Sequence, residues 1–223
     1  MKSKLLYFLC CFLFLASFFL LFQEVKQKKF INTYKKELQI LQSDQERLDN
    51  MRKTLVISYG LSFFEAKYYA IIFDDFSKKY NVPWTIYPAV IRVESNFKTT
   101  HMSPKGAKGI GQMLEATAKE TADKLGIEYK PSETLWNEIL NLVLTLTYLS
   151  EGIQQEGVEN GVKRYLGGPS YAQVEKVNKD AGIYIGAYKT TVWQEYTRLS
   201  YIFKGVQVKD PSDSLFSETP KTK

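Results

Sequence analysis

The N-terminal part of the chain changes abruptly from an apolar to a charged pattern. Residues 5–22 form an unbroken apolar run rich in Leu and Phe, and a run of roughly 18 residues is long enough to predict a membrane-spanning helix. A cleaved secretory signal is the alternative, but the run resumes after Ala16 and Ser17 without a small-residue cleavage site. We therefore predict an uncleaved signal anchor over residues 1–23. Lysines flank the run on both sides, so charge leaves its orientation open.

Residues 24–60 predict a helical stalk. The segment is charged and contains no Gly or Pro before Gly60. Residues at two positions of a heptad repeat form one seam along the helix, and about half of the residues on this seam are apolar. One position holds Ile31, Leu38, Gln45 and Arg52, and the other holds Tyr34, Leu41, Leu48 and Leu55. The polar residues on the seam weaken a stable dimer. Two arrangements stay open, a paired stalk and a single helix that packs back on the domain.

The rest of the chain predicts an all-α domain over residues 61–203, because helical periodicity recurs and no series of strands appears. Ser62 and Glu65 have the spacing of a capping box that begins the first helix. The most apolar stretch, residues 132–155, is expected to be the central helix. The polar tail over residues 204–223 is expected to be disordered. The predicted helices cover residues 63–80, 84–95, 117–125, 132–155, 172–179 and 183–203.

Composition narrows the chemistry of this domain. The only cysteines are Cys10 and Cys11, inside the apolar run, and the single histidine is His101. A Cys-His nucleophile pair or a cysteine-based metal site is therefore not expected, and we expect no metal and no cofactor. The net charge of +6 is spread along the chain, which indicates solubility rather than a nucleic-acid partner. Acid-base chemistry would fall to Asp, Glu, Tyr or Lys.

Glu94 is the strongest candidate for that chemistry. On a helix it shares a face with Ile91 and Val90, both apolar. Desolvation on such a face raises the pKa of a carboxyl group and keeps it protonated near neutral pH, as a general acid requires. A glutamate whose side chain swings into solvent is the simpler interpretation, and what separates the two is the loop that follows.

That loop combines glycines with polar side chains. Gly106, Gly109 and Gly111 permit close approach of the backbone to a ligand, and Gln112 ends the loop with an amide. A phosphate-binding loop is excluded, because the sequence has neither the Gly-Lys-Ser/Thr ending nor a preceding strand. An ordinary connection between helices is the alternative.

These residues together resemble the soluble lytic transglycosylase (SLT) domain, a goose-lysozyme-like fold that cleaves peptidoglycan. The resemblance rests on motifs in the right order and at the right spacing, and it covers roughly residues 73–201. It implies an all-α, lysozyme-like catalytic domain behind the anchor and stalk. The matching residues are Glu94-Ser95, the stretch from Ser103 to Gln112, Thr117-Ala118, Asn141 and the turn from Arg164 to Pro169.

The resemblance also implies residue roles. Glu94 would be the only catalytic carboxylate, and the hydroxyl of Tyr165 would contact it. The sugar groove would be lined by Ser103, Gly109, Gln112 and Leu114.

Four positions depart from the family pattern. Gly111 and Leu114 each replace a usual Met, Glu115 replaces a usual Pro, and Leu166 replaces the usual Asn of the tyrosine turn. The first three are expected to alter the shape of the groove. Leu166 bears on how Tyr165 is positioned.

The activity implied is that of a lytic transglycosylase, which cleaves the β-1,4 bond between MurNAc and GlcNAc and forms 1,6-anhydro-MurNAc. A hydrolytic glycosidase usually needs a second carboxylate across the bond. The alternatives are a hydrolytic muramidase of the lysozyme type and a non-catalytic peptidoglycan-binding scaffold. Candidates for a second acid are Glu65, Asp74, Asp75, Glu115 and Glu120.

The expected partners are peptidoglycan glycan strands, the membrane through the N-terminal helix, and an envelope-spanning machine that needs gaps in the wall. If the substrate is peptidoglycan, the catalytic domain faces the periplasm or cell wall. This gives a single-pass protein of the plasma (inner) membrane with a short cytoplasmic N-terminus.

Overall fold

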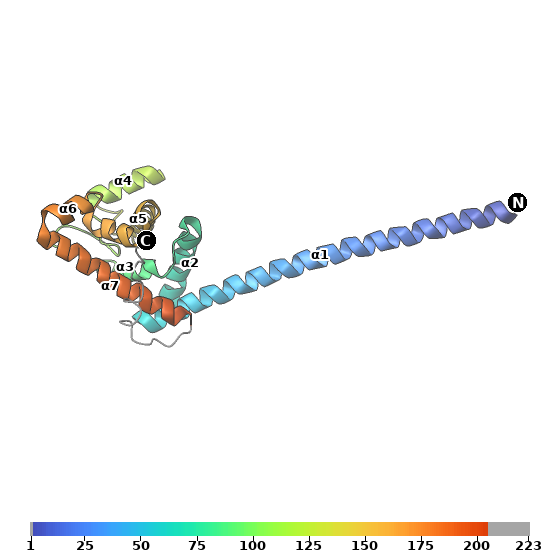
Figure 1. The fold of residues 1–223 in the computed structure, drawn as a ribbon, viewed down its shortest axis with the longest axis horizontal. Helices are drawn as coiled ribbons and strands as arrows, with labels where there is room; N and C mark the ends of the chain where they lie inside the picture. Colours follow the sequence, from blue (N-terminus) through green and yellow to red (C-terminus); the bar gives the residue numbers. More distant parts are fainter. Residues whose placement is uncertain (1, 205–223) are drawn as a thin grey trace, which may run out of the picture. The chain divides into compact units, whose positions relative to one another are not determined.

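The computed structural model describes residues 2–204 of the 223-residue chain, without the side chains of residues 2–16, 174, 175, 177 and 179. The chain divides into two compact units, Met1–Asp49 and Asn50–Lys223. Helix α1 (Lys2–Tyr59) contributes to both units (Figure 1). The predicted disordered tail lies outside the described residues.

The first unit contains the N-terminal part of α1, and most of its predicted seam is exposed. Ile31, Tyr34, Leu38 and Leu41 are exposed, whereas Leu48 near the end of the unit is half-buried. In the described part of the chain, no helix is both long and apolar enough to cross a membrane. The predicted span over residues 5–22 lies mainly where side chains are not described, and it stays a prediction.

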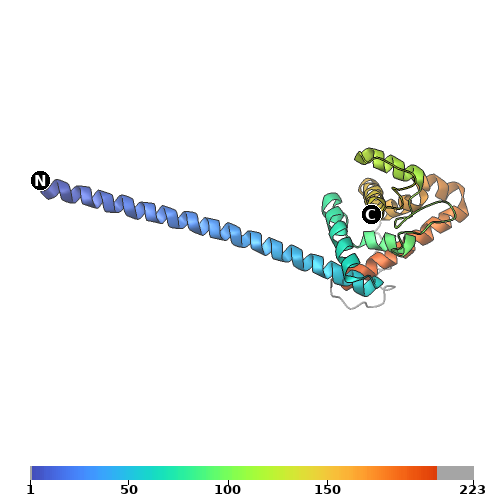
Figure 2. The ribbon, with the colours of Figure 1, turned by 180° about the vertical axis from the view of Figure 1, so that it is seen from behind.

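The second unit is all-helical, as predicted. Within residues 50–204 the only β pairing is two isolated bridges, which join Lys108 to Met102 and to Met113. Figure 1 and Figure 2 show the helices of this unit from two sides. They are α2 (Phe63–Tyr80), α3 (Ile86–Ser95), α4 (Glu115–Leu125), α5 (Glu138–Gly167), α6 (Tyr171–Val177) and α7 (Lys179–Phe203).

Helix α2 begins and ends as the sequence predicts. The Ser62 hydroxyl accepts a hydrogen bond from the Glu65 amide, and the Glu65 carboxylate accepts one from the Ser62 amide, which completes a capping box. Asn81 ends the helix in the left-handed conformation, with φ of 51°. The sequence signals at both ends were therefore sufficient here.

Helix α5 differs from the prediction at both ends. It begins at Glu138, six residues later than predicted, because the Asn137 side chain caps it by accepting from the Leu140 amide. It also continues beyond residue 155. Gly157, with φ of 81°, reverses the chain, and a second helical leg runs back to Gly167.

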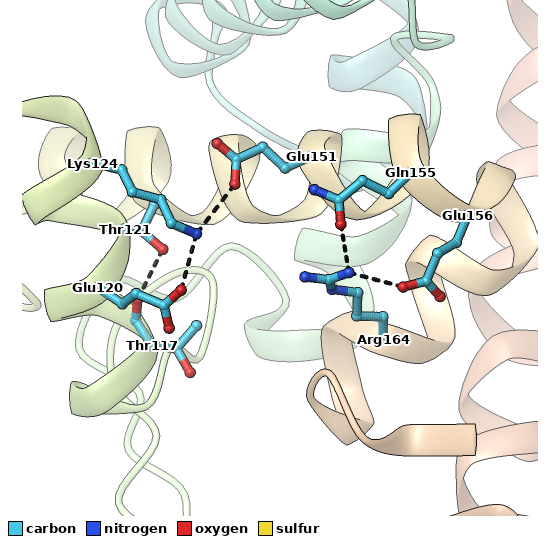
Figure 3. A network of polar contacts seen from close by, with 8 residues as sticks. All are labelled: Thr117, Glu120, Thr121, Lys124, Glu151, Gln155, Glu156 and Arg164. Atoms are coloured by element: carbon cyan, nitrogen blue, oxygen red, sulfur yellow. Dashed lines mark hydrogen bonds and ion pairs between the residues drawn. The ribbon is translucent and has the colours of Figure 1, made fainter. Parts of the chain in front are cut away.

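The two legs of α5 pack closely and are linked by side chains. A Cβ at Gly161 would lie 2.5 Å from the Ile153 nitrogen, so only glycine allows this approach. Arg164 on the return leg donates to Gln155 at 2.7 Å and to Glu156 at 2.8 Å, as Figure 3 shows. The same view shows Lys124 of α4 between Glu120 and Glu151, which ties α4 to α5.

Helix α3 is enclosed by the rest of the unit and lies against α7. Most of its length is buried, including Ile86, Tyr87, Val90 and Ile91. The Tyr87 hydroxyl is paired with Ser150 of α5 at 2.9 Å. A helix buried over most of its length in this way is a rigid support for the residues at its C-terminal end.

The last turns of α1 belong to the core of this second unit. Met51 and Leu55 are fully buried. The Tyr59 ring packs on Phe97 with centroids 4.9 Å apart, and the guanidinium of Arg198 lies 5.7 Å from its centre. Arg198 in turn donates to Glu195 at 3.0 Å. The folded unit therefore begins about ten residues before the predicted boundary at residue 61.

Candidate active site

Glu94 stands on the last turn of α3, where the helix meets the glycine-containing loop. Asn96 ends the helix in the left-handed conformation, with φ of 52°. The hydroxyl of the neighbouring Ser95 is buried and donates to the Ile110 carbonyl at 2.6 Å. Ser95 therefore fixes the loop next to the carboxyl group of Glu94.

Asn141 of α5 holds the loop from the opposite side. Its side chain is fully buried, accepts from the Gly111 amide at 2.9 Å and donates to the carbonyls of Lys108 and Leu135. This satisfies one acceptor and two donors of a buried amide, so the loop and α5 form one polar unit.

The loop residues predicted to line the groove have different positions. Ser103 accepts from the Ala107 amide and closes a tight turn, while Gln112 donates to the carbonyls of His101 and Gly109. Gly109 is buried away from the pocket, because a Cβ there would lie 2.2 Å from the Asn141 side chain. The prediction that Gly109 lines the groove therefore finds no support, and its role is close packing.

A pocket of about 520 Å³ opens above Glu94. It lies between the loop, the first turns of α4, the turn after the second leg of α5, and the start of α7. Five residues predicted for the site do line it, namely Glu94, Ser103, Gln112, Leu114 and Tyr165. Leu166, which departs from the family pattern, also lines the pocket, as do Thr117, Tyr148 and Tyr184.

The tyrosine that hydrogen bonds Glu94 is Tyr188 of α7. Its hydroxyl donates to Glu94 Oε1 at 2.5 Å, whereas the predicted partner, Tyr165, donates to the Gly111 carbonyl at 2.5 Å. Tyr165 therefore fixes the loop at Gly111 in this structure, and the expected direct contact with Glu94 is made by Tyr188.

The sequence contained a signal for Tyr188. It shares an apolar stripe with Val192 and Leu199, and all three are buried. A buried tyrosine hydroxyl needs a polar partner, so a tyrosine on the stripe that faces α3 points to a polar group on that helix. Periodicity alone can indicate that Tyr188 is buried, but not which polar group its hydroxyl contacts.

Burial raises the pKa of Glu94 from its ordinary value of 4.5 to about 7, and the hydrogen bond from Tyr188 limits that rise. The carboxyl is half-buried, with apolar residues beneath it and the pocket in front. Burial and the nearby Glu94 both raise the pKa of Tyr188 well above its usual range, so its hydroxyl stays protonated as a donor.

Glu94 is the only acidic residue among the described residues that line the pocket. The five candidates for a second acid (Glu65, Asp74, Asp75, Glu115 and Glu120) lie outside the pocket lining, and Glu120 instead pairs with Lys124 at 3.0 Å. The arrangement can donate one proton and take one back at a single position.

Comparison with models of protein families gives a match to the second unit of the chain. Residues 72–184 match the model of the transglycosylase SLT domain, which is just over half of the chain. A comparison with curated protein sequences gives no match.

The solved structures that are similar to the chain include two of lytic transglycosylases. One is an inactive Glu-to-Gln mutant of the lytic transglycosylase Slt from Pseudomonas aeruginosa, with 24% identity, a TM-score of 0.52, and coverage of 60% of this chain and 24% of that one. The other is the 70 kDa soluble lytic transglycosylase of Escherichia coli, with 20% identity, a TM-score of 0.49, and coverage of 73% and 30%. The chain thus spans less than a third of either protein, and the first likeness concerns the fold.

Proposed function

Because this chain belongs to the transglycosylase SLT domain family, we propose that it is a peptidoglycan lytic transglycosylase that cleaves the β-1,4 bond between MurNAc and GlcNAc. The observation that carries the proposal is the position of Glu94 in the pocket, where the Tyr188 hydroxyl donates to it at 2.5 Å. The Glu94 pKa of about 7 makes both the acid and the base form available near neutral pH, and Glu94 is the only carboxyl group among the described residues of the pocket lining.

A single carboxyl group is sufficient for the proposed reaction. Glu94 first donates its proton to the glycosidic oxygen, so that the C1–O bond breaks and GlcNAc leaves with a new hydroxyl. The C6 hydroxyl of the same MurNAc then attacks C1 and gives its proton to the Glu94 carboxylate. The product is 1,6-anhydro-MurNAc, Glu94 is protonated again, and no water is consumed.

The two tyrosines would support this reaction in different ways. Tyr188 holds one oxygen of Glu94 and stabilises the carboxylate that forms after the first step. Tyr165 holds the Gly111 carbonyl and so maintains the loop wall of the pocket. Both would be positioning residues, and Glu94 would be the catalytic residue.

Product analysis tests the activity. Purified sacculi treated with the full-length chain should release muropeptides that end in 1,6-anhydro-MurNAc, identified by mass spectrometry. Products with reducing ends would instead indicate a hydrolytic muramidase. Binding without release of any muropeptide would indicate a peptidoglycan-binding scaffold, and either outcome would overturn the proposal.

Tyr188→Phe tests the support of Glu94. Removal of the hydroxyl removes the hydrogen bond that lowers the pKa of Glu94, so the alkaline limb of the pH profile of kcat/KM should move to higher pH. Loss of the fixed carboxyl orientation should reduce kcat by about 10-fold. Both quantities can be measured on soluble glycan fragments between pH 5 and 9.

The matched control is Tyr196→Phe, two turns further along α7, where the tyrosine ring packs on Trp193. It should leave both the profile and kcat unchanged. A Tyr188→Phe profile that coincides with that of the wild type would show that the hydroxyl does not act on Glu94.

We further propose that the apolar run over residues 5–22 anchors the chain in the plasma membrane, with the catalytic domain on the side of the wall. The support is the length of this run. After cell fractionation the full-length chain should resist extraction by alkaline carbonate and be released by detergent. Replacing Leu13 and Leu20 by Arg should shift it to the extractable fraction, whereas an anchor-independent protein would be extractable in both forms.

A tethered enzyme acts only on wall within reach of its anchor. This suits local opening of the peptidoglycan mesh, as an envelope-spanning machine would require, and such a machine remains the predicted partner. Co-purification of a membrane complex with the catalytically inactive full-length chain would identify it.

A further inference from the structure

The pocket contains one cationic side chain whose role the proposed reaction does not explain. Among the described residues that line the pocket, Lys105 is the only lysine, arginine or histidine. Its side chain is exposed, and within residues 2–204 no carboxylate forms an ion pair with it. The neighbouring Lys108 does have an acidic neighbour, Glu115, at 3.9 Å.

The backbone at Lys105 is fixed although its side chain is free. Lys105 stands at the tip of a tight turn, in which the Gly106 amide donates to the Ser103 carbonyl at 2.9 Å. The Ala107 amide donates to the Ser103 hydroxyl, and the Ser103 amide donates to the Ala107 carbonyl. Pro104 restricts the turn further, and Gly106 supplies the φ of 81° that it requires.

The other polar groups of the pocket wall suit an uncharged sugar. The hydroxyl and amide groups of the lining are uncharged, and they belong to Ser103, Gln112, Thr117 and Tyr148. Such groups can hydrogen bond to the neutral hydroxyl and acetamido groups of a sugar. A lysine ammonium that must stay solvated gains little from such partners. Opposite a carboxylate it forms a charge-assisted hydrogen bond, which is shorter and stronger.

Peptidoglycan carries carboxylates close to the bond that would be cleaved. Where the muramyl residue bears a stem peptide, carboxylates lie on the amino acids of that peptide. Where the peptide is absent, the lactyl group itself ends in a carboxylate. We propose that Lys105 binds a carboxylate carried by the muramyl unit and so selects anionic glycan strands; this inference rests on the proposed function for the identity of the substrate.

The test measures binding, so it does not depend on cleavage. The full-length chain with Glu94→Gln is compared with and without Lys105→Gln, on soluble glycan fragments of three kinds. The first kind keeps its stem peptides, the second has been stripped of them by an amidase, and the third has been stripped and its lactyl carboxylates converted to amides. Lys67→Gln is the matched control, because Lys67 is an exposed lysine of α2, which contributes nothing to the pocket lining.

Lys105→Gln should raise the Kd by about 2- to 5-fold on a charged strand, the upper part of the range for loss of one exposed ion pair. An effect on the peptide-bearing strand alone assigns the carboxylate to the stem peptide, and an effect on the stripped strand alone assigns it to the lactyl group. Lys105→Arg should restore binding in either case. The loss should shrink as salt is raised.

Equal Kd values for Lys105→Gln and Lys67→Gln on both charged strands would overturn the inference. So would an equal loss on the amidated strand, because a neutral ligand cannot report a charge pair. Failure of the proposed function has a different signature. In that case the wild type releases no anhydro product, whatever the Kd values of the Glu94→Gln variants.

Discussion

Replacing Glu94 by glutamine should stabilise the fold at alkaline pH while it abolishes cleavage. Burial raises the pKa of Glu94 from 4.5 to about 7, so the folded state holds this proton more tightly than the unfolded state. Wild-type stability therefore falls as pH rises from about 4.5 to 7. The loss approaches about 3 kcal/mol above pH 7.5, at 1.36 kcal/mol per pKa unit. Glutamine does not titrate and escapes this loss.

Unfolding by urea at intervals between pH 4 and 8 measures this effect. The two proteins should have similar free energies of unfolding at pH 4 and should diverge above pH 5, with the variant more stable. Glu133→Gln is the control, since this exposed glutamate lies outside the pocket. Its replacement should leave the free energy of unfolding unchanged. A constant difference across the whole pH range would contradict the assigned pKa.

The same substitution should reduce cleavage by about 10³-fold or more, because glutamine can neither donate nor accept the transferred proton. Quantified anhydro-muropeptide release measures it. If Glu94→Gln retained near-normal activity with its fold intact, the catalytic assignment would be wrong. A gain in stability with a loss of activity would show that the site is held in a state the fold itself disfavours.

Gly111→Ala should destabilise the domain by about 2–3 kcal/mol, the upper part of the range for overpacking a buried site. An ideal Cβ at Gly111 would lie 1.7 Å from Thr145 Oγ1 and 2.6 Å from Thr145 Cγ2. Relief of this overlap requires movement of a loop that Asn141 and Tyr165 hold at Gly111. The pocket wall should shift with it, so activity should fall as well.

A double substitution separates overlap from other effects. Thr145→Gly removes the three atoms nearest to a Cβ at Gly111, so it should recover part of the lost stability despite the cost of about 1 kcal/mol for glycine within a helix. Gly186→Ala on α7 is the control, because its Cβ would meet open space; it should be neutral or stabilising. Thermal unfolding of the four variants measures this, and an absence of coupling between positions 111 and 145 would refute the explanation.

The overlap also accounts for one departure from the SLT family pattern. A methionine at position 111, as is usual in the family that the sequence resembles, cannot fit while Thr145 faces the loop. The sequence showed the departure, but its cause lies on a helix more than 30 residues away along the chain. Local patterns do not contain information of that kind.

The helices themselves were largely predictable. The capping box at Ser62 is a local interaction, and both it and the bounds of the helix over residues 63–80 were correctly predicted. The prediction ended the central helix at residue 155, close to the reversal at Gly157, but it did not predict the return of the chain as a second helical leg. What decides it is the packing of Gly161 on Ile153.

The structure brings several of the predicted site residues to one pocket, but it places two others differently from the prediction. Glu94, Ser103, Gln112 and Leu114 do line one pocket. Tyr165 was predicted to contact Glu94 through its hydroxyl, but the hydroxyl that donates to Glu94 is that of Tyr188. Gly109 was predicted to line the groove, but it packs closely against Asn141. Both differences depend on how helices distant in sequence face each other, which motif spacing does not specify.

The entry of α1 into the core has a practical consequence for choosing where a recombinant fragment should begin. The family match starts at residue 72, and a fragment cut there would lack Met51, Leu55 and Tyr59. It would lose two fully buried side chains and the ring that packs on Phe97, one residue beyond the C-cap of the helix that carries Glu94. We therefore expect a stable recombinant form of this domain to need the chain from about Asn50 onward.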